Sequence, residues 1–202
     1  MKWIRSLAAL ALVSGTVLSA KAWPALGIRI YDRSSLPSAD LARSLRELRA
    51  IYQSAGINIT IRNCPQSASC PEQFDANEVG VRLLPGTFPS DPRRLAVAFV
   101  ARGGKLSTIY LSAVIEAASR TNVSASRVLG YAMAHEAAHL FGLSHSRCGV
   151  MKAGWTDTDY RAMDEGRMRF TRAEGEALHS RAAMNSDREV SSASLAGTGE
   201  QQ

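Results

Sequence analysis

Long apolar segments are scarce in this sequence of 202 residues. The main apolar run, Leu7–Val17, is too short to cross a bilayer comfortably and contains Ser14 and Gly15. No Cys follows the run, which argues against a lipid anchor, and no internal repeat is visible. We therefore expect no membrane-spanning segment in the mature chain and no repeat architecture.

The first 22 residues have the pattern of a secretory signal peptide. Lys2 and Arg5 precede the apolar run, and Ala20-Lys21-Ala22 forms a small-x-small cleavage site before Trp23. A membrane anchor is the alternative interpretation, and the short run disfavours it. We expect a secreted or periplasmic protein.

After removal of the predicted signal peptide, the chain also lacks a strong net charge of either sign. Removing residues 1–22 takes away three cations (Lys2, Arg5 and Lys21) and no anions, so the formal net charge falls from +6 to +3. Arg43, Arg46 and Arg49 recur at helical spacing, which is typical of a solvated helix face. We expect no binding of nucleic acid.

Cysteine is rare, with three residues in the chain. Export favours disulfides, and Cys64 and Cys70 flank a short loop that could close on itself. Three pairings are possible and the sequence does not decide between them. We favour Cys64–Cys70, which leaves Cys148 free, buried or intermolecular.

The order of secondary structure follows from hydrophobic periodicity and turn residues. The pattern is β-α-β-β-β-β-α-α, a mixed sheet with helices, followed by a segment rich in Ser, Gly and Gln. We expect strands at 27–31, 57–61 and 79–83, a hairpin within 95–111, and helices at 38–55 and 124–140. A short helical stretch at 157–164 and a last helix capped by Thr171 and Glu174 complete the pattern. The predicted units are a signal peptide (1–22), one folded domain (23–184) and a disordered tail (185–202).

Histidine is also scarce, yet three of the four His residues of the chain lie within the eleven residues from His135 to His145. His135 and His139 are one helical turn apart on one face, so both imidazoles can reach one tetrahedral ion. Glu136 is adjacent, where its carboxylate can reach a metal-bound water without ligating the metal. Structural histidines on a core helix are the alternative, and His179 fits a surface or capping role better than that of a ligand.

Gly142 explains how a third ligand can join the first two. A continued helix would point residue 145 away, whereas a Gly just beyond the helix can take positive φ and reverse the chain. His145 can then return to the metal. Three neutral nitrogen ligands leave a fourth position open, which is the pattern of a catalytic zinc ion.

The stretch HEAAHLFGLSH resembles the HExxHxxGxxH signature of the metzincin metallopeptidases. Six residues after His145, Met151 resembles the Met of the family's Met-turn, an apolar floor beneath the ligands, although an ordinary core Met is the alternative. The resemblance implies one catalytic Zn²⁺ held by the three histidines, with Glu136 as general base. It also implies an α+β fold: a mixed, mostly parallel twisted sheet with an antiparallel edge strand, an active-site helix and a C-terminal helix.

The segment Ala96-Val97-Ala98-Phe99 resembles the matrixin strand that lies above the active-site cleft, where an extended substrate could add to the sheet. An ordinary hairpin strand is an equal alternative for these residues. The segment after Met151, with Lys152–Trp155 and Tyr160, is expected to shape the specificity pocket.

Three departures from the known subfamilies limit the resemblance. The first strand begins soon after the cleavage site, so we expect no matrixin-type latency segment. Residues 85–94 lack the His and Asp cluster that holds further ions in matrixins, and Cys148 does not fit the cysteine spacing of archaemetzincins. We expect a small, divergent metzincin that is closest to the matrixin type.

The predicted activity is zinc-dependent endopeptidase chemistry, in which a zinc-activated water hydrolyses a peptide bond with Glu136 as base. The expected partner is a peptide or protein substrate, and the expected state is a monomer. Two alternatives stay open: a zinc-stabilised module that binds peptides without turnover, and a zinc hydrolase of non-peptide amides. The retained Glu136 argues against the binding module.

Overall fold

The computed structural model describes residues 26–64, 70–91, 93–98 and 104–196. The predicted signal peptide and Trp23 lie outside these residues, as does Phe99. Among the described residues, no helix combines the length and apolar character that a bilayer crossing requires.

The fold is α+β, with one five-stranded sheet and five helices in the described part of the chain. The strands follow the order β2-β1-β3-β5-β4 across the sheet. Their bounds are Leu26–Asp32 (β1), Ile59–Asn63 (β2), Glu78–Leu84 (β3), Ala96–Ala98 (β4) and Leu106–Tyr110 (β5). The helices are Ser38–Ser54 (α1), Leu111–Thr121 (α2), Ala125–Leu140 (α3), Asp157–Asp164 (α4) and Arg172–Ala196 (α5).

The sheet is parallel except at one edge. β1 pairs in parallel with β2 and β3, and β3 pairs in parallel with β5. β4 pairs with β5 in antiparallel register, with Val97 opposite Thr108. The sheet is therefore mixed, and the short strand β4 forms one of its edges.

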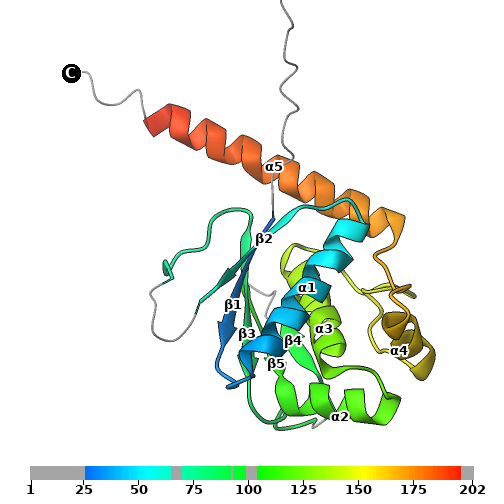
Figure 1. Cartoon of the computed structure of the whole chain (residues 1–202). Helices are drawn as coiled ribbons and strands as arrows, with labels where there is room; N and C mark the ends of the chain where they lie inside the picture. The colour runs from blue at the N-terminus through cyan, green and yellow to red at the C-terminus, as the bar shows by residue number, and fades with distance from the viewer. Residues whose placement is uncertain (1–25, 65–69, 92, 99–103, 197–202) are drawn as a thin grey trace, which may run out of the picture.

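Helices α1 and α3 pack against each other and against the sheet (Figure 1). The core between them is built from alternate residues of β1 and β3, with Ile28 opposite Val79 and Ile30 opposite Val81. Gly130 lets the two helices approach closely, because a Cβ at this position would lie 2.5 Å from Glu47 Cβ. Burial of these apolar side chains is the main driving force that holds α3 in place.

A buried arginine connects β1 to β3 and to the segment that follows the disulfide. The Arg29 guanidinium, 1% exposed, contacts the Glu78 carboxylate and donates to Gln73 O at 2.7 Å. It also lies over the Phe74 ring, 4.7 Å from its centroid. The hydrogen bond from Arg29 holds the pKa of Glu78 below its usual range. The contacts of Arg29 with Gln73 and Phe74 thus hold this segment onto the sheet.

The favoured cysteine pairing is present, since Cys64 and Cys70 form a disulfide. Cys148 is free and exposed. The predicted capping box is present as well, because Thr171 N donates to Glu174 Oε2 at 2.7 Å and Glu174 N donates to Thr171 Oγ1 at 3.3 Å.

Two helical segments differ from the sequence-based expectation. Helix α2, which packs Val114, Ala117 and Ala118 into the core, was not predicted. Helix α5 continues to Ala196, into the segment expected to be a disordered tail. No Gly or Pro occurs between Glu176 and Ala196 to interrupt it, and Gly197 is the first such residue. In Figure 1, α5 crosses the end of the sheet where β1 begins.

Candidate metal centre

Helix α3 carries the first two histidines of the cluster and is fixed at both ends. Ser124 caps its N-terminus by accepting from Arg127 N at 3.4 Å. At the other end, Gly142 N donates to His139 O at 2.9 Å and Leu143 N donates to Ala138 O at 3.0 Å. This is the Schellman arrangement, and it requires the positive φ of Gly142, +96°. The chain reverses there, as the sequence predicted.

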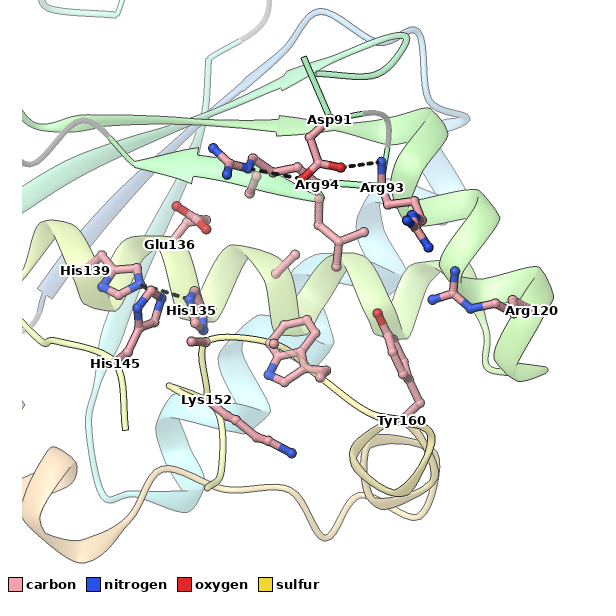
Figure 2. Close-up of a pocket in the computed structure, with 16 residues that line it drawn as sticks. Asp91, Arg93, Arg94, Arg120, His135, Glu136, His139, His145, Lys152 and Tyr160 are labelled. Atoms are coloured by element: carbon pink, nitrogen blue, oxygen red, sulfur yellow. Dashed lines mark hydrogen bonds and ion pairs between the residues drawn. The ribbon is translucent and has the colours of Figure 1, made fainter. Parts of the chain in front are cut away.

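The reversal brings three imidazoles together (Figure 2). His139 Nε2 lies 2.9 Å from His135 Nε2 and 3.0 Å from His145 Nε2. Ligand atoms of all three lie within 4.8 Å of one another. A tetrahedral zinc ion at roughly 2.0–2.1 Å from each nitrogen keeps ligand atoms roughly 3.3 Å apart. His135 Nε2 and His145 Nε2 each need to move from His139 Nε2 by only a few tenths of an ångström to reach this spacing.

Two main-chain carbonyls determine which ring nitrogens can bind a metal. His135 Nδ1 donates to Val150 O at 2.7 Å, and His139 Nδ1 donates to Leu143 O at 2.8 Å. A carbonyl oxygen can only accept, so each Nδ1 carries the proton and each Nε2 presents a lone pair. The lone pairs of two neutral rings therefore face each other at 2.9 Å with no proton between them. A shared cation removes this repulsion, so the residues fit a metal ion.

Burial favours the neutral form of two of the three rings. Desolvation lowers the pKa of His135 to about 4, and it also lowers the pKa of His139. Both imidazoles thus carry a single proton and no charge at neutral pH, which is the state that binds a metal. His145 is the exposed member of the cluster.

Glu136 lies beside the three histidines and is not one of the possible metal ligands. Its side chain is buried, and its Oε2 has no hydrogen-bond partner among the described residues. Burial raises the pKa of Glu136 to about 7. A buried carboxylate without a partner is costly, so this oxygen is poised to accept a proton from a molecule that enters the site.

The segment after His145 contacts the cluster through the Val150 carbonyl, which accepts from His135 Nδ1. Val150 and Met151 are both fully buried, and Ser146 N donates to Met151 O at 2.9 Å. Val150 N donates to Arg169 O at 3.1 Å, which ties the segment to the chain before α5. The Val150 carbonyl that orients His135 is therefore held rigidly.

A pocket of about 670 Å³ opens onto the three histidines. In Figure 2 the imidazoles and Glu136 lie towards one end, and Arg93, Arg120 and Tyr160 lie towards the other. The lining also includes Lys152–Trp155 and Tyr160, which were expected from the sequence to shape the specificity pocket. The lining residues are Asp91, Arg93, Arg94, Leu95, Ala96, Arg120, Ala132, His135, Glu136, His139, His145, Lys152, Ala153, Gly154, Trp155 and Tyr160.

The predicted edge strand is only partly described. Ala96 lines the pocket, Val97 and Ala98 belong to β4, and Phe99 lies outside the described residues. Asp91, Arg93, Arg94 and Arg120 also line the pocket, and the sequence analysis did not select them. Their positions in a loop and at the end of the missed helix α2 carry no motif, so only the folded chain brings them to the histidines.

Comparison of the sequence with protein families and with curated proteins finds no match. Solved structures do match the fold. A zinc-dependent peptidase from Methanocorpusculum labreanum aligns with a TM-score of 0.52 at 15% identity, over 75% of this chain and 100% of that chain. Archaemetzincin from Methanopyrus kandleri aligns with a TM-score of 0.54 at 14% identity, over 80% of this chain and 98% of that chain. The chain shares the fold of these proteins.

Proposed function

We propose that the protein is a zinc-dependent endopeptidase. The observation that carries this proposal is the convergence of three imidazole nitrogens beside a buried carboxylate with no hydrogen-bond partner on Oε2 among the described residues, within one open pocket. The shared fold with a zinc-dependent peptidase is consistent with it.

His135, His139 and His145 would hold one zinc ion through their Nε2 atoms. Zinc bound there would supply a Lewis acid that polarises a carbonyl group and lowers the pKa of water. The Val150 and Leu143 carbonyls keep the first two rings in the required orientation and tautomer. Three protein ligands leave a position for a reacting molecule.

Glu136 would act as the general base. Its carboxylate takes the proton of the attacking water and then donates it to the amine that leaves the cleaved peptide bond. The pKa of about 7 that burial gives Glu136 suits a group that must both accept and release a proton near neutral pH.

Strand β4 would orient the substrate. It is an edge strand that pairs with β5 on one side, so its other side can pair with an extended peptide. Ala96 lines the pocket, and its small side chain lets the peptide approach closely. The residues involved would be those predicted from the sequence, Ala96 to Phe99.

We also propose that the site is of the metzincin type, closest to matrixins. HEAAHLFGLSH provides the signature, and the buried Met151 would form the apolar floor of a Met-turn. Export through the N-terminal signal, followed by action as a monomer on peptides or proteins, completes the proposal.

The test compares the mature protein with Glu136→Ala. We expect the wild-type chain to bind one zinc ion and to cleave members of a diverse peptide library. Glu136→Ala should retain zinc and lose at least about 100-fold in kcat/KM, because removing a general base commonly costs this much. Metal content and mass spectrometry of the peptide products provide the two measurements.

Two results would argue against the proposal. A zinc-loaded wild-type protein that leaves the whole library intact is not an endopeptidase. Equal peptide binding by wild type and Glu136→Ala, without cleavage by either, would instead support a binding module. His179→Ala serves as a control, since His179 does not belong to the cluster.

A further inference from the structure

Four cationic side chains line the pocket beside the three histidines: Arg93, Arg94, Arg120 and Lys152. An exposed cation is solvated by water and needs no partner, whereas a cation that is already paired with a carboxylate must break that pair before it binds another anion. The pairing of each of the four cations therefore bears on what the pocket can bind.

Two of these cations are already engaged. Arg94 Nε lies 3.8 Å from Asp91 Oδ2, and its guanidinium lies over the Phe88 ring, 5.1 Å from the centroid. Lys152 Nζ lies 2.5 Å from Asp159 Oδ2. Asp159 also accepts from Thr156 in the capping box of α4, so this pair is part of a helix start. Neither cation is available to bind a substrate without breaking a contact.

The other two cations have no carboxylate partner among the described residues. The Arg93 backbone N donates to Asp91 Oδ1 at 3.2 Å, but its guanidinium forms no ion pair with any residue that the structure describes. Arg120, at the C-terminal end of α2, likewise has no ion pair in the described part of the chain. Both side chains are exposed and line the same pocket. Figure 2 shows them pointing from different elements into the space beside Tyr160.

This arrangement favours an anion. Two like charges that face one space repel each other, and a carboxylate placed there relieves the repulsion. A guanidinium can bind a carboxylate through two parallel N–H···O hydrogen bonds. The Tyr160 hydroxyl, which Figure 2 shows directed to the same space, offers a further neutral donor.

We propose that Arg93 and Arg120 bind a carboxylate of the substrate. The pocket then selects peptides that carry an Asp or Glu residue next to the peptide bond that lies at the three histidines. This inference rests on the proposed function only where it concerns the cleavage of an acidic peptide. Binding of the carboxylate does not require turnover, and it can be measured separately.

The test uses zinc-loaded Glu136→Ala, so that peptides bind without being cut. Labelled peptides carry one Glu at successive positions in a neutral sequence, and each has a twin with Gln at the same position. All are amidated at the C-terminus. One Gln peptide is also made with a free C-terminal carboxylate, which distinguishes a side-chain carboxylate from a terminal one. Fluorescence anisotropy at low ionic strength gives the dissociation constants.

At one Glu position we expect binding about tenfold tighter than that of the Gln twin, the effect of one charge-assisted contact. Arg120→Leu and Arg93→Leu, each added to Glu136→Ala, should reduce this ratio to nearly one. Arg120→Glu should reverse it in favour of a Lys twin. About 0.5 M salt should weaken the preference, because both arginines are exposed. Arg49→Leu, an exposed helical Arg outside the pocket lining, is the matched control and should leave the ratio unchanged.

Equal binding of the Glu and Gln twins at every position would overturn the proposal, as would a preference that survives Arg120→Leu. Tight binding of the free C-terminal carboxylate alone would also overturn the preference for Asp or Glu, and it would assign the two arginines to the end of the substrate instead. Zinc content confirms that each variant retains the site. Wild-type cleavage of the Gln twins, without any preference for Glu, would leave the endopeptidase proposal standing while refuting this one.

Discussion

At the scale of single residues, the geometry of the metal centre depends on atoms that belong to the main chain. The acceptors that orient His135 and His139 are the carbonyls of Val150 and Leu143, and the turn that returns His145 depends on the backbone of Gly142. The three histidines, Glu136 and Gly142 could be predicted, because their side chains and spacing form a motif. The two carbonyls could not, because every residue has one.

The first prediction concerns Gly142. Gly142→Ala should lower the free energy of unfolding by about 1–2 kcal/mol, because a Cβ is strained at positive φ and would meet the Arg181 guanidinium. It should also weaken zinc binding by about tenfold, since His145 depends on the turn. Chemical denaturation and competition with a zinc-binding dye would measure the two effects.

Gly175→Ala is the matched control for Gly142→Ala. Gly175 lies in α5, and an added Cβ there meets only ordinary contacts, 3.6 Å from Ala55. We expect unchanged zinc affinity and equal or greater stability, because Ala favours a helix. If Gly142→Ala behaved like this control, the turn would not be what positions His145.

At the scale of elements, the strands and the metal-binding helix followed from the sequence, whereas α2 and the end of α5 did not. The expected short helix at 157–164 is present as α4. Helix α2 was missed because its start, Leu111, directly follows β5, so its apolar residues read as the end of a hairpin. The spacing of Val114, Ala117 and Ala118 was the signal that could have revealed it. This omission matters for function, because α2 carries Arg120 into the pocket.

The contact between α1 and α3 gives a second prediction. Gly130→Ala should destabilise the protein by about 1–2 kcal/mol, although Ala favours a helix interior. The added Cβ would lie 2.5 Å from Glu47 Cβ and 3.1 Å from Ser44 O, and atoms this close to the backbone cannot rotate away. Thermal and urea denaturation would measure the loss. A variant more stable than wild type would contradict the close packing of these helices.

At the scale of the whole molecule, the metal site joins the helical core to the segment that precedes α5. Two of the three histidines lie on α3, and the third lies beyond the turn, next to the segment that Val150 N ties to Arg169 O. A bound ion therefore links parts of the chain that would separate on unfolding. Its binding energy contributes to stability as long as the unfolded chain binds it less well.

The third prediction is that chelation lowers the melting temperature. At a zinc concentration about 1,000 times the Kd, the ion adds about 4 kcal/mol, which corresponds to a shift of roughly 10 °C for a chain of this size. We expect EDTA to produce this fall and added zinc to reverse it, as measured by calorimetry. His135→Ala should melt at the lower temperature with or without EDTA. Identical melting of wild type with zinc and with EDTA would show that the site holds no stabilising ion.

The use of main-chain carbonyls to orient the ligands has a consequence for how the sequence can change over evolution. Any residue at positions 143 and 150 supplies the same carbonyl, provided that the turn and the buried packing are kept. Substitution of the side chains at these positions is therefore compatible with an intact metal site. Proteins that share this site can therefore diverge far in sequence, as long as the backbone keeps its path around the three histidines.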